Sequence, residues 1–351
     1  MLLSNQFRQS VGPALSNVLP VAIAGSGVAL PRQMLTSDQI DSRLGWPMGE
    51  TARRFRIDSR AVAGPDETTS ALAAGAAIRA LKAAGFAATD MDLILAACGV
   101  AEQPIPSTAV LVHARLGLQD SGIPAYDIGA TCLSFLAALD HAALKIAAGQ
   151  ARRVLIVSAD IASVGLDWSQ PEAAAIFGDG AAAVVVTRAE VDAGTSAPAI
   201  LAQRFETWSE GRDACVLAAG GTRINPARPG GIRPEDALFR MDGAAAFRVS
   251  RKRLPGFVRR LLDAADVARD RIDLVIPHQA SAQALDHAAA LLGFARDRVI
   301  DIFARHGNQI AASLPTALHH AITSGRLRRG QTALLIGTSA GISLGGAVLR
   351  F

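Results

Sequence analysis

The stretch at residues 79–95 reads RALKAAGFAATDMDLIL, and the stretch at residues 260–276 reads RLLDAADVARDRIDLVI. Both predict an amphipathic helix, a short turn, an aspartate and a buried strand, and Asp92 and Asp273 are offset by 181 residues. A second pair follows at an offset of 179, with ALDHA at 138–142 and ALHHA at 317–321. A repeat of this length indicates a duplicated fold unit. We therefore expect equivalent turns of the two copies to face each other across a pseudo-twofold axis, where polar groups converge on one pocket.

Apolar strands alternate with helices along the whole chain, which predicts an α/β fold with sheets covered on both faces. Between residues 188 and 199 the pattern is interrupted by Ala, Gly, Ser, Pro and acidic residues, so we place the boundary between the halves there. This predicts an N-terminal extension (1–20), a first half (21–190) and a second half (200–351). Residues 205–240 are rich in glycine, proline and charge and predict a long functional loop. Strands are expected at 21–24, 93–97, 125–128, 154–158, 181–186, 274–277, 333–336 and 342–351, and helices at 70–84, 108–116 and 132–148.

Composition excludes several classes of function. The chain has 351 residues, half of them apolar, and a formal net charge of +4. The arginines are spread without aromatic interleaving, which argues against nucleic acid. No apolar run reaches the roughly 20 residues that span a bilayer, and the first twenty residues lack the apolar core of a signal peptide. The three cysteines have no metal-ligand spacing, which favours a reducing compartment, and we expect the cytoplasm.

One cysteine lies at a turn suited to nucleophilic chemistry. Residues 126–136 read YDIGATCLSFL, which predicts a strand, a tight turn and a helix opening at Cys132. Backbone N–H groups and the positive end of the helix dipole stabilise a thiolate at such a position, so we expect a lowered pKa for Cys132. The alternative is an inert buried cysteine. Cys98 and Cys215 lack such a turn and are interpreted as structural.

Two further turns carry polar side chains at strand ends of the second half. His278 follows the strand LVIP, and Asn308 follows the sequence FARHG. By the offset of 179, Asn308 corresponds to Gly129, three residues before Cys132, which places it facing the cysteine turn. A capping Asn and a satisfied core His are the alternatives for either residue alone. His306 competes with them, but it matches Asp127 at a strand end, where a structural role is expected.

Two short motifs are rejected. Gly25-Ser-Gly27 lacks the third glycine and the immediate helix of a dinucleotide-binding loop. Gly337-Thr-Ser339-Ala-Gly341 has the spacing of a serine-hydrolase nucleophile elbow. That elbow requires a helix after the serine, whereas a terminal strand is expected here, and no histidine follows Ser339.

Taken together, these residues make the chain resemble the β-ketoacyl-acyl-carrier-protein synthase III family of the thiolase superfamily. The resemblance covers nearly everything after residue 20 and implies a duplicated thiolase-like five-layer αβαβα sandwich, usually a homodimer. It rests on several motifs in the family's order: GPDET (64–68), the Cys132 turn, FGDGAAA (177–183), FRMDG (239–243), PHQA (277–280), HGN (306–308) with AASLP (311–315), and the terminal LRF (349–351).

The resemblance implies a catalytic triad of Cys132, His278 and Asn308. Cys132 would take an acyl group from an acyl-CoA or acyl-carrier-protein thioester, and a malonyl thioester would then lose carbon dioxide and attack it as an enolate. His278 and Asn308 would donate hydrogen bonds to that enolate. The backbone N–H of Cys132 and one from Ala340 or Gly341 would form the oxyanion hole. No metal or redox cofactor is implied.

Several positions depart from the housekeeping members of the family. PHQA continues into Ser281 rather than Asn, and Pro171 stands near the place of an arginine that helps to hold coenzyme A. Trp46 lies a few residues before the place of the family's adenine-stacking tryptophan, whereas Arg54 fits the arginine that accompanies it. Ile105 stands where an aromatic residue often lines the acyl pocket, and a smaller side chain there would admit a longer or branched chain. It is not the glutamate of the head-to-head condensing enzymes of olefin synthesis.

A basic stretch predicts either a solvated helix face or a docking surface for an acidic acyl carrier protein. Its members are Arg248, Arg251, Lys252, Arg253, Arg259 and Arg260.

Three hypotheses follow from these observations. The first is a decarboxylating condensing enzyme of fatty-acid or specialised-metabolite synthesis. The second keeps the fold but moves the Cys132-bound acyl group to a hydroxyl or amine. The third is a degenerate, non-catalytic partner subunit. The intact His278 and Asn308 favour the first, because transfer alone forms no enolate.

Overall fold

The structure is a computed structural model that describes residues 18–189 and 197–351. The expected N-terminal extension, except its last three residues, therefore lies outside the described residues. Residues 190–196 of the expected boundary segment between the halves lie outside them too. At the start of the described chain, Leu19 forms a bridge with Ile200, with N–H···O distances of 2.9 and 3.0 Å between their backbones.

The first sheet is built from the first half of the chain and has the order β1-β7-β6-β4-β5. In this sheet β4 is parallel to β5 and β6, whereas β7 is antiparallel to both β6 and β1. The strands are β1 (Val21–Ala29), β4 (Leu93–Ala96), β5 (Ala125–Asp127), β6 (Arg153–Asp160) and β7 (Gly180–Arg188).

The second sheet repeats this plan with the order β8-β13-β12-β11. Again the inner pair β11 and β12 is parallel, and β13 is antiparallel to both its neighbours. A parallel bridge between Val275 and Val299 stands where the first sheet has β5. The strands are β8 (Ala199–Thr207), β11 (Leu274–Pro277), β12 (Thr332–Ser339) and β13 (Ser343–Arg350). The expected terminal strand at 342–351 is thus confirmed.

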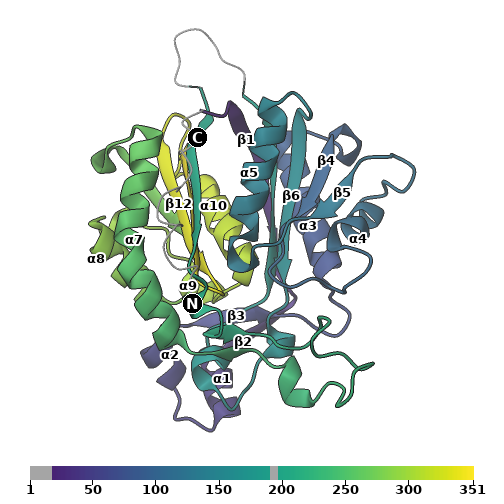
Figure 1. Cartoon of the computed structure of the whole chain (residues 1–351), viewed down its shortest axis with the longest axis vertical. Coiled ribbons are helices and arrows are strands. Elements are labelled where there is room, and N and C mark those ends of the chain that lie inside the picture. Colours follow the sequence, from purple (N-terminus) through teal and green to yellow (C-terminus); the bar gives the residue numbers. More distant parts are fainter. Residues whose placement is uncertain (1–17, 190–196) are drawn as a thin grey trace, which may run out of the picture.

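Helices form three layers around these two sheets (Figure 1). The helices α5 (Ser134–Ala147) and α10 (Ser313–Thr323) lie between the sheets, and each contacts strands of both. The outer helix α3 (Thr69–Ala84), beside α4 (Thr108–Arg115), covers the first sheet, and α7 (Gly243–Ala265), beside α8 (Ala282–Leu292), covers the second. The result is the expected five-layer αβαβα sandwich.

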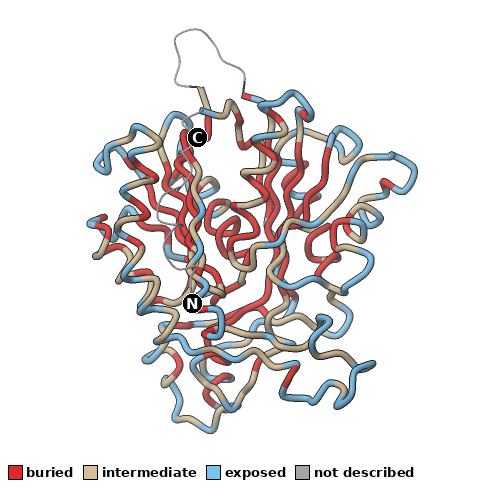
Figure 2. The backbone as a smooth tube through the Cα atoms, in the orientation of Figure 1, coloured by how far each residue is buried: buried red, intermediate tan, exposed pale blue. Residues whose placement is uncertain are grey.

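The central layer is packed by small side chains. Ala138 and Ala142 of α5 and Ala317 and Ala321 of α10 are fully buried in one apolar cluster with residues of both sheets. Figure 2 shows this buried interior continuing through both sheets. Apolar burial of this kind contributes about 25 cal/mol per Å² and is the main force that stabilises the fold. The repeated alanines found in the sequence are therefore the contact surface of the two copies.

Gly25 and Gly27 serve helix packing rather than nucleotide binding. A Cβ at Gly25 would lie 2.5 Å from the carbonyl oxygen of Ala80. A Cβ at Gly27 would lie 2.5 Å from the backbone nitrogen of Ala80. The glycines let β1 approach α3 at backbone distance.

A smaller set of elements lies at one end of the sandwich, below the sheets in Figure 1, and includes the antiparallel pair β2 and β3. The sequence patterns did not predict these elements, because they are too short to show a period. The short elements of the chain are β2 (Gln33–Thr36), α1 (Ser37–Leu44), α2 (Glu50–Phe55), β3 (Ser59–Val62), α6 (Pro171–Ala174), β9 (Cys215–Val216), β10 (Arg240–Met241) and α9 (Phe303–His306). Short 3-10 helices occupy Ala88–Asp90, Thr131–Leu133, Ser163–Gly165, Ser209–Gly211, Pro234–Ala237, Arg269–Arg271, Arg296–Arg298 and Ile310–Ala312.

Among the described residues, no helix is both long and apolar enough to cross a lipid bilayer.

Candidate active site

Cys132 lies in the turn between β5 and α5. The turn is the 3-10 helix Thr131–Leu133, so the cysteine precedes α5 by two residues rather than opening it. Thr131 takes a left-handed backbone conformation with φ 53°, and Ser134 Oγ accepts the N–H of Ala130 at 2.8 Å. These two features reverse the direction of the chain and place the cysteine at the N-terminus of α5.

The second half contains the same turn at an offset of 179. Ile310 has φ 50°, and Ser313 Oγ accepts the N–H of Gln309 at 2.8 Å. Position 310 corresponds to 131 and position 313 to 134 at this offset. The two turns pack against each other. The repeat found in the sequence therefore produces two matching turns that meet, as expected.

His278 directly follows β11. Its backbone N–H donates to Ile336 O at 2.8 Å, and its carbonyl accepts from Ala280 N–H at 3.0 Å. The side chain is 6% exposed. The parallel pairing of β11 with β12 thus ends in a turn that holds the imidazole inside the molecule.

Asn308 is held on three sides. Its backbone N–H donates to Ile176 O at 2.8 Å, and its carbonyl accepts from Gly178 at 3.1 Å. Its side-chain Oδ1 accepts the N–H of Ile310 at 2.9 Å, and Nδ2 lies 3.4 Å from Ala280 O. The carboxamide is therefore tied both to its own turn and to the turn that carries His278.

Gly337 brings the cysteine turn and the histidine turn together. A Cβ at this position would lie 2.9 Å from Leu133 Cδ2 and 3.0 Å from His278 Cβ. Only a glycine lets both side chains approach β12 this closely. The structure thus places Cys132, His278 and Asn308 on neighbouring turns, linked through Gly337 and Ala280.

The pKa of the Cys132 thiol in the free protein differs from the expectation. Burial raises the pKa of Cys132 to about 12, and the charges of Asp160 and Cys215 act in the same direction. The backbone N–H groups of Ala340 and of Cys132 itself face the sulfur and oppose this shift, but they do not overcome it. The predicted lowering of the pKa is therefore wrong for the free protein, because the sequence shows the helix start but not the burial. The sulfur is a neutral thiol at pH 7.

His278 is neutral as well. Burial lowers the pKa of His278 to about 4. Its Nδ1 is buried and has no hydrogen-bond partner among the described residues. A neutral imidazole can present one N–H and one bare nitrogen. The ring can therefore both accept a proton and donate a hydrogen bond to a substrate.

Sequence reasoning missed Asp160, which is fully buried at the end of β6. Its carboxylate accepts the N–H groups of Gly99 at 2.8 Å, Val100 at 2.9 Å and Ala311 at 2.9 Å. Burial raises the pKa of Asp160 to about 7, against the effect of these backbone donors. The residue joins a loop of the first half to the second-half turn that follows Asn308. The only signal in the sequence is an aspartate directly after an apolar strand.

The remaining predicted oxyanion donors lie in the loop between β12 and β13. The N–H of Ala340 faces the Cys132 sulfur, and Gly341 has φ 87°, which a glycine adopts without strain. The motif around Ser339 joins two antiparallel strands. In the described chain a strand, not a helix, follows Ser339, so the rejection of a serine nucleophile is confirmed.

Cys215 is not remote from the site. It lies on β9, is partly buried, and is close enough for a thiolate there to raise the pKa of Cys132. Burial and the charge of Asp242 raise the pKa of Cys215. Its interpretation as purely structural therefore overlooked its place beside the site. His306, the competing histidine, is part of α9, and burial lowers its pKa to about 4.

Two of the predicted substrate-binding residues have structural partners. Arg54 Nε donates to Glu50 at 2.6 Å, and its guanidinium stands 4.7 Å from the ring centroid of Trp46. Ser281 caps α8, where its Oγ accepts the N–H of Ala284 at 3.1 Å.

Ile105 is 86% exposed in the single chain. Its role at an acyl pocket therefore stays a prediction, and in the single chain its side chain faces solvent.

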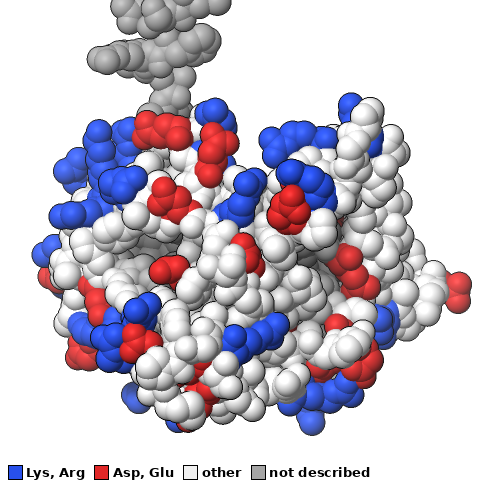
Figure 3. Space-filling view, turned by 90° about the horizontal axis from the view of Figure 1, so that it is seen from below, with Lys and Arg blue, Asp and Glu red and all other residues white. Residues whose placement is uncertain are grey.

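The basic stretch on α7 divides into two groups. Arg253 and Arg260 form ion pairs with Glu210 and Glu206. Arg248, Arg251, Lys252 and Arg259 are exposed and form no ion pair with any described residue. Figure 3 shows basic and acidic groups interspersed over the end of the molecule that carries the small elements, with basic groups gathered on the side of α7 and α8. Within the described parts of the chain, no cluster of His, Cys, Asp and Glu could hold a metal ion.

Comparisons with known proteins identify the family of the chain. The family model described as 3-oxoacyl-[acyl-carrier-protein] synthase III matches residues 126–203, and the model of its C-terminal part matches residues 262–351. A relative named beta-ketoacyl-[acyl-carrier-protein] synthase III, from Erythrobacter litoralis, is 35% identical over 95% of this chain and 100% of its own length. Another of the same name, from Thiobacillus denitrificans, is 36% identical over 94% of this chain and 98% of its own length.

Solved structures show the same relationship. The synthase III of Aquifex aeolicus superimposes with a TM-score of 0.83 at 32% identity, over 94% of this chain and 100% of that one. The enzyme of Pseudomonas aeruginosa gives 0.84 at 31% identity, over 95% and 98%. OleA of Xanthomonas campestris, at 22% identity and a TM-score of 0.81, shares the fold. The chain belongs to the β-ketoacyl-acyl-carrier-protein synthase III family of condensing enzymes.

Proposed function

We propose that this chain catalyses decarboxylative condensation of a Cys132-bound acyl group with a malonyl thioester, giving a β-ketoacyl thioester. The observation that carries the proposal is the meeting of a thiol, a neutral imidazole and a carboxamide on neighbouring turns from both halves. Such a set supplies a nucleophile and two hydrogen-bond donors at one point.

In the first step, Cys132 Sγ attacks the carbonyl carbon of an acyl thioester. The N–H groups of Cys132 and Ala340, which face the sulfur, stabilise the oxyanion that forms. The carbon–sulfur bond to the donor breaks, and the donor leaves as a thiol that carries the proton from Cys132. Because the resting thiol is neutral, this proton must move during the attack, and the bare nitrogen of His278 is the nearby group suited to relay it.

In the second step, a malonyl thioester occupies the same pocket. Cleavage of its carbon–carboxylate bond releases carbon dioxide and leaves an enolate, whose oxygen accepts hydrogen bonds from His278 and from Nδ2 of Asn308. The enolate carbon attacks the acyl carbon, the bond to Sγ breaks, and the thiolate takes up one proton. A carboxamide held by its Oδ1 on Ile310 is oriented with Nδ2 available for this role.

Substrates and assembly follow from the family and the exposed groups. The acyl donor is a coenzyme A or carrier-protein thioester, and the extender is malonyl-CoA or malonyl carrier protein. Arg248, Arg251 and Lys252 would steer an acidic carrier protein to α7. A homodimer would cover exposed Ile105 and bring it to an acyl pocket. We place the protein in the cytoplasm, working without a metal or redox cofactor.

The test is a panel of acyl donors crossed with malonyl-CoA and malonyl carrier protein, with carbon dioxide and the β-keto product both measured. We expect equal amounts of the two from at least one pair, and neither from Cys132→Ala. Transfer of the acyl group to a hydroxyl or amine, with no carbon dioxide released, would establish the non-condensing alternative instead.

A further inference from the structure

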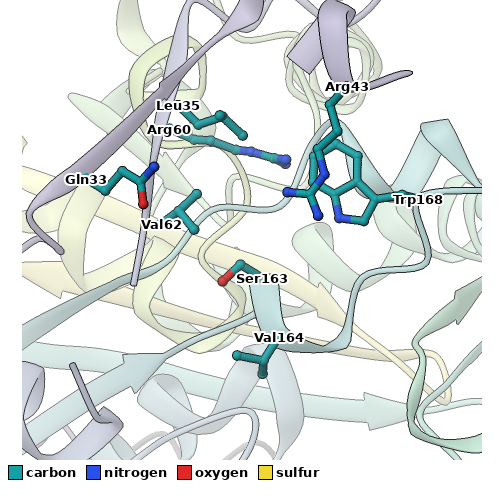
Figure 4. Close-up of a pocket in the computed structure, with 8 residues that line it drawn as sticks. All are labelled: Gln33, Leu35, Arg43, Arg60, Val62, Ser163, Val164 and Trp168. Atoms are coloured by element: carbon teal, nitrogen blue, oxygen red, sulfur yellow. The ribbon is translucent and has the colours of Figure 1, made fainter. Parts of the chain in front are cut away.

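A polar cavity lies against the antiparallel pair β2 and β3 (Figure 4). Its volume is about 180 Å³. Its polar lining comes from Gln33 of β2, Arg43 of α1, Arg60 of β3, and Ser163 and Trp168 of the segment after β6. None of the residues that line it belongs to the thiol, imidazole and carboxamide site.

Arg60 is the unusual member of this lining. Its side chain is fully buried, and its Nη1 donates to the carbonyl of Phe177. Its Nε and Nη2 are buried and have no hydrogen-bond partner among the described residues. Burial lowers the pKa of Arg60 to about 10, so it stays charged at pH 7. Buried donors left without acceptors are costly and rare in native proteins.

The nearest carboxylate does not satisfy these donors. Asp179 lies close enough for its charge to act on Arg60. Its two oxygens, however, are taken by the backbone and hydroxyl of Ser163, at 2.9 and 2.6 Å, and by the N–H of Ala63 at 2.8 Å. Asp179 therefore offsets part of the charge of Arg60 and leaves its Nε and Nη2 free for another acceptor.

A second guanidinium faces the same space. Arg43 stacks on Trp168 with its Cζ 3.8 Å from the ring centroid, and Cζ of Arg60 is 5.5 Å from the same ring. The charge of Arg43 acts against that of Arg60. No acidic side chain of the described residues lines the cavity. Figure 4 shows the guanidinium of Arg60 pointing toward Arg43 and Trp168. An anion between the two would turn this repulsion into attraction.

We propose that this cavity binds a phosphate-class oxyanion. Nε and Nη2 of Arg60 form the planar fork that pairs with two oxygens of a phosphate group, and exposed Arg43 closes the solvent side. The volume suits one phosphate group rather than a whole nucleotide. The same chemistry is offered by inorganic phosphate and by a phosphate of coenzyme A. The proposal does not depend on the condensing activity.

The test is calorimetric titration of the whole chain with inorganic phosphate at constant ionic strength. We expect one saturable site per chain, a roughly tenfold weaker site in Arg43→Gln, and no site in Arg60→Met. Arg53→Gln is the matched control, because Arg53 is an exposed helix arginine that already pairs with Glu50, and its affinity should equal that of the wild type. The midpoint temperature of thermal unfolding should rise with phosphate concentration in the wild type and the control but not in Arg60→Met.

The second arm adds coenzyme A to the phosphate-loaded protein. Displacement of phosphate by coenzyme A, with weaker coenzyme A binding in Arg43→Gln, identifies a phosphate of coenzyme A as the occupant. Retention of phosphate beside coenzyme A identifies the free anion. If the wild type shows no saturable phosphate binding up to about 50 mM, or if Arg43→Gln binds as tightly as the wild type, the proposal is overturned. If Arg60→Met does not fold, the phosphate affinity of Arg43→Gln still decides between the two outcomes.

Discussion

The cysteine turn of the first half and the matching turn of the second half have the same backbone conformation. They differ in the groups that their backbone N–H groups face. Position 311 corresponds to 132 at the offset of 179. In the second half, the N–H of Ala311 donates to the buried carboxylate of Asp160 at 2.9 Å. In the first half, the N–H of Cys132 faces its own sulfur together with the N–H of Ala340.

This difference shows how duplication yields one site rather than two. In the second copy, the backbone N–H groups of the turn (here called its amide cradle) bind the internal carboxylate of Asp160, and the adjoining loop contributes Asn308. The first copy keeps the cradle for a substrate oxygen and supplies the thiol. Preorganised amides aimed at a developing charge contribute strongly to the rate of acyl transfer. Substitutions confined to one copy therefore probe the contrast directly.

The largest effect is expected from Cys132→Ala. We expect complete loss of the acyl adduct and of condensation, because only the first-half cradle faces a thiol. Intact-mass spectrometry after incubation with an acyl thioester measures the adduct. Adding Ala311→Cys to this variant should not restore it, since Asp160 occupies that cradle. An adduct on the double variant would show that the two turns are chemically interchangeable.

Asn308→Ala should leave acylation intact and slow condensation by about 10²–10³, the typical effect of removing one oxyanion donor. The matched control is Gly129→Ala at the equivalent first-half position, where an added Cβ meets nothing within 4 Å. Acylation is followed by mass and condensation by carbon dioxide release. Equal condensation rates in Asn308→Ala and Gly129→Ala would show that the carboxamide of Asn308 has no part in the mechanism.

Alkylation of Cys132 by iodoacetamide should accelerate about tenfold per pH unit between pH 7 and pH 9, because burial raises the pKa of the thiol to about 12. The thiolate fraction grows in proportion to hydroxide at every pH below that value. Cys132→Ala provides the background from Cys98 and Cys215. A rate that levels off near pH 7 would mean that the helix start prevails over burial after all.

Gly337→Ala should destabilise the protein by about 1–3 kcal/mol, because its Cβ would press on Leu133 and His278. The first-half counterpart is Ser158, which carries a side chain at the same place. Chemical denaturation measures the loss, and condensation should fall as well. Gly221→Ala, whose Cβ meets no atom within 4 Å, is the control. Unchanged stability and activity would show that the two halves do not need this close contact.

The smallest effect is a pH dependence at Asp160. Its pKa is raised from the usual value near 4 to about 7 in the fold, so the stability it contributes is present below pH 4 and is lost as pH rises through 7. Asp160→Asn removes this dependence. The unfolding free energy of the wild type, relative to the variant, should therefore fall between pH 4 and pH 7.5. A difference that rises with pH would show that the backbone donors outweigh the burial.

The sequence predicted the features that depend on local pattern. Apolar runs located the strands of both sheets except β8, whose last residues overlap the long loop predicted at 205–240. The offset of 179 placed Asn308 beside the cysteine turn. It could not predict the pKa of Cys132, because burial is a property of tertiary packing. Asp160 was missed for the same reason, since its partner Ala311 lies 151 residues away. The high exposure of Ile105 was not foreseen either, because a family pattern does not show which surface remains exposed in one chain.

A single-turnover experiment in two stages tests whether Cys132 holds the acyl group that condenses. The protein is first acylated and freed of donor, and a malonyl thioester is then added while the Cys132 peptide is followed by mass. We predict that the acyl mass leaves Cys132 at the rate at which carbon dioxide and the β-keto product appear. An acyl group that stays on the cysteine, or leaves without forming a carbon–carbon bond, would contradict the proposed condensation.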